Sequence, residues 1–127
     1  IFGDVKENIV HVNEHDRAAG YLELERARVR WFLSINEDVL PDEVKAKGQR
    51  TYRSITIEGE ELEFSGGFTD LHNRVYKSIL DGNGYGLEDA RQAIEIVHTI
   101  RYAETKGLVG EYHPFANKKL AKHPFSK

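Results

Sequence analysis

The sequence predicts an α+β domain, with an open, mostly antiparallel sheet that carries its helices on one face. Three observations support this prediction. Apolar and polar residues alternate with the two-residue period of strands through much of the first half of the chain. These segments have one polar face, which is typical of antiparallel strands covered on one side only. The helical period begins only after residue 67, so strands come first and helices last.

The first part of the sheet is expected to contain three strands. Apolar residues alternate over residues 8–13, and the alternation resumes over 21–25 after a polar turn at 14–20. Residues 26–35 form the third strand. Its apolar side carries Ala27, Val29, Trp31, Leu33 and Ile35. Its other side carries Arg26, Arg28, Arg30, Phe32 and Ser34.

A hairpin is expected next. Residues 36–50 contain prolyl, glycyl and many charged residues, which indicate a loop with room for one helical turn. Residues 51–57 are rich in β-branched residues and alternate, and the chain returns at 62–64 after a tight turn at 58–60.

Two amphipathic helices are expected to follow. The apolar stripe of the first consists of Phe68, Leu71, Val75 and Ile79. Thr69 is its expected N-cap, and Gly82 its expected terminator. The second helix should run over residues 87–104, with Glu88 and Asp89 in its first turn, where the helix dipole favours negative charge.

The domain is therefore expected to span residues 1–104, followed by an extended, partly mobile tail at 105–127. The tail contains His-Pro-Phe twice, at 113–115 and 123–125. This repeat could be a docking motif. The favoured interpretation is an arm that lies on its own domain or on a neighbour.

Composition excludes several classes of function. The net charge is -3 with both signs interspersed, so no basic patch indicates nucleic acid or an anionic membrane. The apolar runs are too short to span a membrane. Absence of cysteine removes disulfides and thiolate catalysis, and it fits the reducing cytoplasm. The chain has no methionine and begins at Ile1, so we expect it to have been cut from a longer protein.

The alternating glycines Gly82, Gly84 and Gly86 resemble a phosphate-binding loop, but a dinucleotide fingerprint leaves a strand and enters a helix. Here the loop follows a helix, and the acidic residues after it would repel a pyrophosphate. We therefore expect a helix–helix turn.

The histidines do not indicate a metal site. His11 and His15 are too far apart along a strand and turn to share a metal ion. His72 and His98 lie beside apolar helix stripes, so we expect buried, hydrogen-bonded side chains rather than ligands.

The arginine face of the third strand is the best candidate site. Arginines Arg26, Arg28 and Arg30 there, with Arg53 beside Tyr52 in the hairpin, could hold a carboxylate or a phosphate. The competing interpretation is a solvated face, or one packed on another subunit. Nothing supplies a nucleophile and base.

Five short motifs occur in an order that resembles the C-terminal part of the sugar-nucleotide dehydrogenases of the glucose-fructose oxidoreductase/inositol dehydrogenase superfamily. The resemblance covers roughly residues 1–104. The motifs are AGYLE (19–23), ARVRWFLS (27–34), TYRSI (51–55), GFTDLH (67–72) and GYG running into DAR (84–91).

The resemblance implies a two-domain enzyme whose missing N-terminal domain binds NAD and carries the catalytic lysine–histidine pair. This chain would be the partial C-terminal substrate and oligomerisation domain, with no catalytic, cofactor-binding or metal-binding residue. The implied reaction is oxidation of the 3-hydroxyl of UDP-N-acetylglucosaminuronate in lipopolysaccharide O-antigen synthesis. An oligomerisation module of a related dehydrogenase, acting on another sugar, is the alternative.

From chemistry rather than from the resemblance, the candidate substrate-binding residues are Arg28, Arg30, Trp31, Tyr52 and Arg53. The expected partners are the UDP-sugar and a second copy of the chain across the open sheet face.

Overall fold

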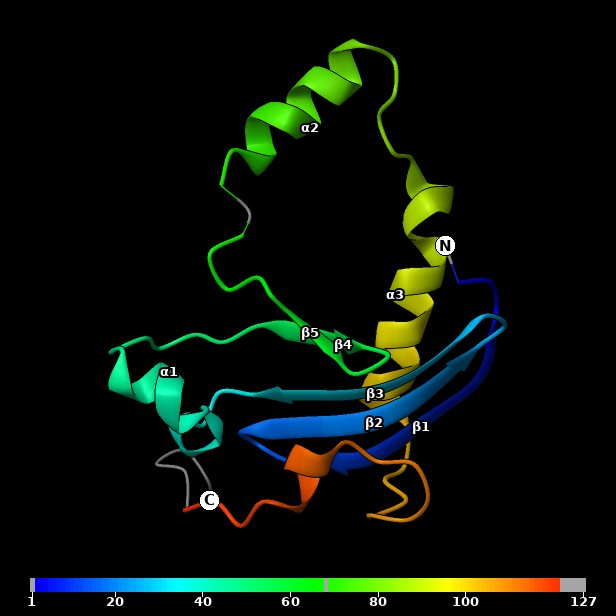
Figure 1. The fold of residues 1–127 in the computed structure, drawn as a ribbon. Coiled ribbons are helices and arrows are strands. Elements are labelled where there is room, and N and C mark those ends of the chain that lie inside the picture. Colours follow the sequence, from blue (N-terminus) through cyan, green and yellow to red (C-terminus); the bar gives the residue numbers. More distant parts are fainter. Residues whose placement is uncertain (1, 68, 122–127) are drawn as a thin grey trace. The chain divides into compact units, whose positions relative to one another are not determined.

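The computed structural model describes residues 2–67 and 69–121 (Figure 1). It divides into two compact units, one formed by residues 1–39 and 93–127 and the other by residues 40–92. Each unit is described by itself. Two sequence predictions lie outside the described residues: the second copy of the His-Pro-Phe motif, at 123–125, and the helix residue Phe68.

The first unit contains a three-stranded antiparallel sheet in the order β1-β2-β3. Its strands are β1 (Val5–Asn13), β2 (Arg17–Leu24) and β3 (Ala27–Ser34). This confirms the three predicted strands, but the turn predicted over 14–20 is wrong from residue 17 onward, because β2 already pairs with both neighbouring strands there. The turn between β2 and β3 consists of Glu25 and Arg26, which the alternation alone places in the strands. Each strand presents alternate residues to the two sheet faces, so the cross-strand register decides which side chains lie together.

At the centre of this sheet the indole of Trp31 packs directly against the backbone of Gly20. Gly20 pairs with Val10 on one side and with Trp31 on the other. A Cβ on Gly20 would lie 2.3 Å from the carbonyl oxygen of Ile9 and 2.4 Å from Cζ2 of Trp31. The absence of a side chain therefore lets the indole pack directly on β2. Val10, only 1% exposed, completes this small core.

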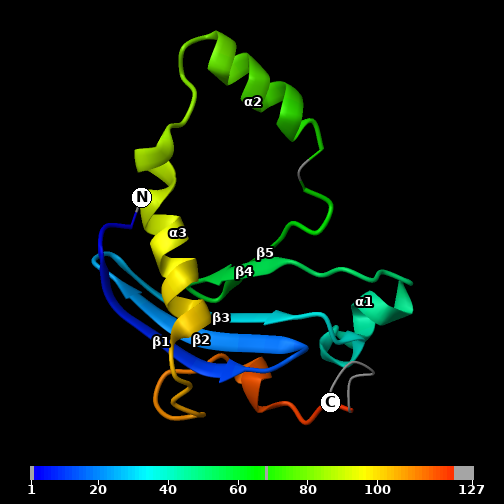
Figure 2. The ribbon, with the colours of Figure 1, turned by 180° about the vertical axis from the view of Figure 1, so that it is seen from behind.

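Different segments cover the two faces of the sheet. The second half of α3 (Leu87–Tyr102) lies against one face, where the side-chain amide of Asn8 donates a 3.4 Å hydrogen bond to the carbonyl of Ile96. The chain then crosses to the other face, as both views in Figures 1 and 2 show. The sequence prediction of helices on one face is confirmed for α3.

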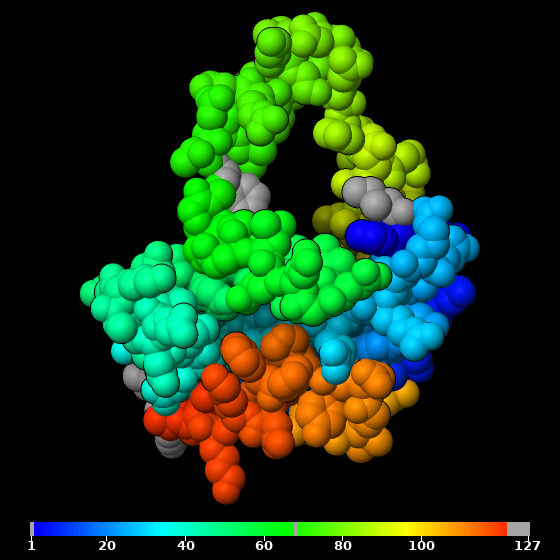
Figure 3. Space-filling model, in the orientation of Figure 1, coloured from blue at the N-terminus to red at the C-terminus, as the bar shows by residue number. Residues whose placement is uncertain are grey.

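Residues 105–121 form an arm that lies on the other sheet face. The backbone N–H of Lys106 donates to the carbonyl of Val10 at 2.9 Å, and Arg17 donates to the carbonyl of Lys118 at 2.9 Å. A short 3-10 helix, η2 (Pro114–Asn117), buries Ala116. In Figure 3 the orange atoms of this arm lie on the atoms of the strands. The favoured interpretation of the tail, an arm on its own domain, is thus confirmed for these residues.

The second unit contains the predicted hairpin. Strands β4 (Ser54–Ile57) and β5 (Glu60–Glu63) pair antiparallel, and Ile57 lies opposite Glu60. The two-residue turn has positive φ at both positions, 51° at Glu58 and 91° at Gly59. This backbone matches the twist of the strands, and Gly59 adopts it without strain. A helical turn, α1 (Asp42–Ala46), lies in the loop where one was expected.

The helices of the second unit are amphipathic but exposed. Helix α2 (Leu71–Leu80) ends before Gly82, which has φ of 78°, as predicted. Its N-cap is Asp70 and not Thr69, because the helix begins one residue later than the pattern suggests. Leu71, Val75 and Ile79 of the apolar stripe are all exposed. Within the described residues, no helix is long and apolar enough to cross a membrane.

Candidate functional site

The five candidate substrate-binding residues belong to both units. Arg28, Arg30 and Trp31 lie on β3, and Tyr52 and Arg53 precede β4. Because side chains alternate along a strand, Trp31 faces the α3 side of the sheet while Arg28 and Arg30 face the arm. Nε1 of Trp31 is buried and has no hydrogen-bond partner within the described part of the chain.

The arginine face carries nearby acids. In the sheet register Arg28 lies opposite Glu23, whose carboxylate accepts a 3.2 Å hydrogen bond from the hydroxyl of Tyr21. Burial, followed by the charge of Glu23, raises the pKa of Tyr21. Arg30 lies 3.8 Å from the carboxylate of Glu111 in the arm, with 54% of its side chain exposed. Such an exposed pair stabilises little, so Arg30 remains able to bind another anion.

An aromatic cluster fastens the arm beside Arg30. The ring of Phe32 stacks on His113 at a centroid distance of 5.7 Å and meets Phe115 edge-on at 5.8 Å. The ammonium of Lys118 lies 4.1 Å from the centroid of the Phe115 ring. Nδ1 of His113 accepts a 3.2 Å hydrogen bond from the backbone N–H of Phe115, and this bond caps η2. The cap requires His113 without a proton on Nδ1.

This cluster predicts that the arm loosens in acid. Burial, and then the positive charge of Arg30, lower the pKa of His113 below its ordinary value of 6.5. The folded form therefore binds the proton more weakly than the unfolded form, so the contribution of His113 is complete above pH 6.5 and is lost as the pH falls through the folded pKa. We expect the amide signal of Phe115 in NMR spectra to lose its protection from exchange over this range.

The variant His113→Asn is the matched control. Asparagine is a good cap acceptor that does not titrate. The variant should keep η2 capped and remove most of the pH dependence of the Phe115 signal. An unchanged titration in this variant would show that another group controls the arm.

A buried histidine lies where the sequence pattern gave no signal for one. His11 is 3% exposed. Its Nδ1 lies 2.7 Å from the carbonyl oxygen of Gly107, and its Nε2 lies 3.2 Å from that of Glu111. The prediction of buried side chains at His72 and His98 is wrong, because both are exposed on amphipathic helices. His11 was missed because its partners are about a hundred residues away.

The other two candidates lie beside the hairpin. The hydroxyl of Tyr52 hydrogen-bonds to the carboxylate of Glu61. This bond raises the pKa of Tyr52 and lowers that of Glu61. The backbone of Arg53 donates to the hydroxyl of Ser65 at 2.8 Å and accepts from the N–H of Phe64 at 2.9 Å. These bonds hold the segment before β4 beside the segment after β5.

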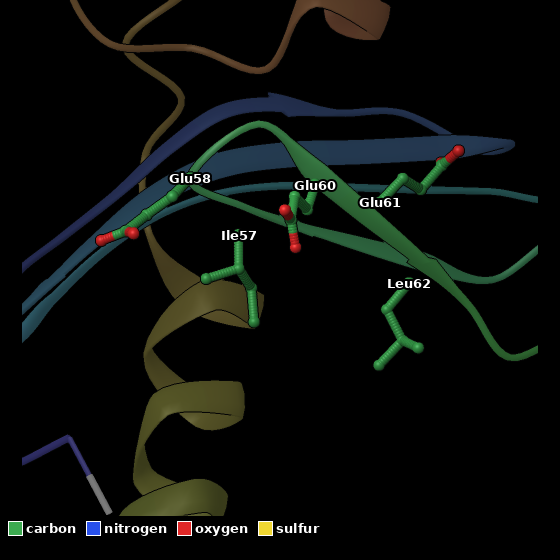
Figure 4. Close-up of a pocket in the computed structure, with 5 residues that line it drawn as sticks. All are labelled: Ile57, Glu58, Glu60, Glu61 and Leu62. Carbon is green, nitrogen blue, oxygen red and sulfur yellow. The ribbon is translucent and has the colours of Figure 1, made fainter.

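A shallow depression on the hairpin is lined by Ile57, Glu58, Glu60, Glu61 and Leu62. In Figure 4 Ile57 and Leu62 point to one side of the hairpin and Glu61 points away. Three carboxylates line this depression, so it would repel a phosphate or carboxylate. Within the described residues, no group of three or more histidines and acids is placed to hold a metal ion.

The glycine-rich segment is a helix–helix turn, as predicted. It connects α2 to α3, and the N–H of Gly86 donates to the carboxylate of Asp89 at 2.7 Å. The carboxylate of Asp89 therefore occupies the N–H of Gly86, one of the donors that a phosphate would need at the start of α3. The described residues do not fit a dinucleotide site.

The solved structures that resemble this chain include two dehydrogenase complexes, while no family model matches the chain. One is the WlbA (WbpB) dehydrogenase from Thermus thermophilus in complex with NAD and alpha-ketoglutarate, with a TM-score of 0.85 and 48% identity. The other is the WlbA (WbpB) dehydrogenase from the same organism in complex with NAD and UDP-GlcNAcA, with a TM-score of 0.83 and 44% identity. Each match covers 90% of this chain and 37% of the other.

Proposed function

The chain belongs with the sugar-nucleotide dehydrogenases of the glucose-fructose oxidoreductase/inositol dehydrogenase superfamily, and on this premise we propose that it is the C-terminal part of an NAD-dependent enzyme. The whole enzyme would oxidise the 3-hydroxyl of UDP-N-acetylglucosaminuronate in lipopolysaccharide O-antigen synthesis, in the cytoplasm. The observation that carries the proposal is 44% identity over 90% of the chain to a dehydrogenase solved with NAD and UDP-GlcNAcA.

This chain would contribute substrate contacts and assembly, not the redox chemistry. NAD accepts the hydride when bound. Its site would lie in the part of the dehydrogenase that this chain does not cover, since the chain spans 37% of the solved relatives. We therefore expect the 127-residue chain alone to oxidise no UDP-sugar.

We assign substrate contacts to the arginines, because a UDP-uronate carries a diphosphate and a carboxylate. Arginine donates to such groups through two parallel N–H bonds. Arg28 and Arg30 are exposed on the same face of the sheet, and Arg53 is exposed before β4. Trp31 and Tyr52 remain candidates for contacts to the sugar or the base.

Removing one such arginine should weaken substrate binding in the complete enzyme. We expect Arg28→Ala or Arg53→Ala to raise the Kd for UDP-N-acetylglucosaminuronate about tenfold, because a hydrogen bond to a charged group contributes about 1.5 kcal/mol. Isothermal titration calorimetry measures this directly. Arg74→Ala, on the exposed surface of α2, is the matched control. Equal affinities in all variants would remove the arginines from the site.

The second candidate function is assembly across the sheet face that carries Trp31, which one observation favours. Val29 and Leu33 of β3 lie on the same side of the strand and are 37% and 68% exposed. Exposed apolar residues grouped in this way often mark an interface. Light scattering measures the molar mass of the chain in solution. If this face forms a specific dimer, the variant Leu33→Lys should dissociate it. A wild-type chain that is a monomer would contradict assembly across this face.

A further inference from the structure

The turn between α2 and α3 contains two sites where a glycine follows an acid or its amide. They are Asp81–Gly82 and Asn83–Gly84. In such pairs the backbone nitrogen of the glycine can attack the preceding side-chain carbonyl carbon, because no Cβ crowds the approach. Asn83 is the only asparagine of the sequence that precedes a glycine.

The attacking nitrogen is engaged at one site and free at the other. The N–H of Gly82 donates a 3.0 Å hydrogen bond to the carbonyl of Ile79, so it is held within the end of α2. Within the part of the chain that the structure describes, the N–H of Gly84 has no hydrogen-bond partner. The structure therefore distinguishes the two glycine nitrogens, because only that of Gly84 is free to attack.

The side chain of Asn83 is also free to react. Its backbone is anchored, since its N–H donates to the carbonyl of Ser78 at 2.8 Å and its carbonyl accepts from the hydroxyl of Ser78 at 2.9 Å. Its amide group has no hydrogen-bond partner among the described residues, and both Asn83 and Gly84 are exposed. Water can therefore reach the reacting atoms.

We propose that Asn83 is a site of spontaneous succinimide formation and deamidation in the chain. The nitrogen of Gly84 forms a bond to Cγ of Asn83 as its proton leaves, and the bond from Cγ to the amide nitrogen breaks to release ammonia. Water then opens the imide at either carbonyl carbon, giving aspartate or isoaspartate at position 83. No oxidant or cofactor is needed.

The product changes the turn in two ways. Either product adds a negative charge beside Asp81, in a turn that α3 follows with Glu88 in its first turn. Isoaspartate also inserts a methylene into the backbone between positions 83 and 84. Gly84 packs closely on Ile79, where a Cβ would lie 3.1 Å from its side chain, so the longer backbone cannot keep this contact.

Incubation of the 127-residue chain at mildly alkaline pH, followed by trypsin digestion and mass spectrometry, tests the proposal. The peptide Ser78–Arg91 should gain the mass of an amide-to-acid conversion, and heavy-oxygen water should label the new carboxyl group. Peptides that contain the other asparagines are internal standards and should stay unmodified. Labelling by an isoaspartyl methyltransferase should appear in the same peptide.

The matched variants are Asn83→Gln and Gly82→Ala. The glutamine keeps an amide but must close a larger ring, so its conversion should fall to the level of the internal standards. Gly82→Ala leaves Asn83 and Gly84 in place, and conversion at Asn83 should persist. Conversion at Asn83 no faster than at the other asparagines, or isoaspartate mainly at Asp81, would overturn the proposal.

Discussion

Gly20→Ala is expected to lower the free energy of unfolding by about 3 kcal/mol, because the new methyl group overpacks the sheet. Its Cβ would lie 2.3 Å from the carbonyl oxygen of Ile9, which is backbone and cannot turn away. The indole of Trp31 blocks the other direction at 2.4 Å. Either the strands must separate or the indole must leave its packed position.

Urea unfolding followed by tryptophan fluorescence measures this loss, since Trp31 is the only tryptophan and lies at the altered position. Gly66→Ala is the matched control, because no atom lies within 4 Å of a Cβ there. The control should keep the midpoint of the wild-type chain. Identical midpoints for both variants would mean that the indole does not pack on Gly20.

His11→Phe should cost about 2 kcal/mol and release the arm. Phenylalanine keeps the ring but has no donor, so the carbonyl of Gly107 or Glu111 that the imidazole contacts loses this partner. The loss of stability should affect mainly residues 105–121, and the sheet should stay folded. Limited proteolysis of this arm, compared with urea unfolding of the whole chain, separates the two effects.

His15→Phe provides the comparison for this variant, because His15 is exposed in the turn after β1. It should leave both proteolysis and unfolding unchanged. Equal protection of the arm in His11→Phe and in the wild-type chain would show that the two carbonyl contacts do not hold it.

Local patterns predicted the local structure well. The three strands and the hairpin follow from the two-residue period, and the hairpin turn falls where Gly59 can adopt a positive φ without strain. Gly82 ends α2 for the same conformational reason. The N-cap was misplaced by one residue because Asp70 adopts a left-handed conformation, with φ of 63°, that side-chain preference alone does not reveal.

Long-range contacts escaped prediction. Nothing in the alternation around His11 indicates that Gly107 and Glu111 supply its partners. The aromatic cluster of Phe32, His113 and Phe115 likewise joins segments far apart in the chain. The arginine candidates came from residue chemistry, and the common face of Arg28 and Arg30 followed from the strand period. Only the hydrogen bonds of the structure show that, of the two glycines in the α2–α3 turn, Gly82 has an engaged backbone nitrogen and Gly84 a free one.

The arm has a consequence for synthesis on the ribosome. The carbonyl of Val10 in β1 accepts a hydrogen bond from the N–H of Lys106, and the ring of His11 lies against the carbonyl of Gly107, 96 residues further along the chain. Nascent β1 must therefore keep one edge and one face uncovered until the ribosome has translated this later segment. Contacts of such sequence separation form slowly, so a nascent chain stalled before residue 106 should be prone to aggregation and a good chaperone client.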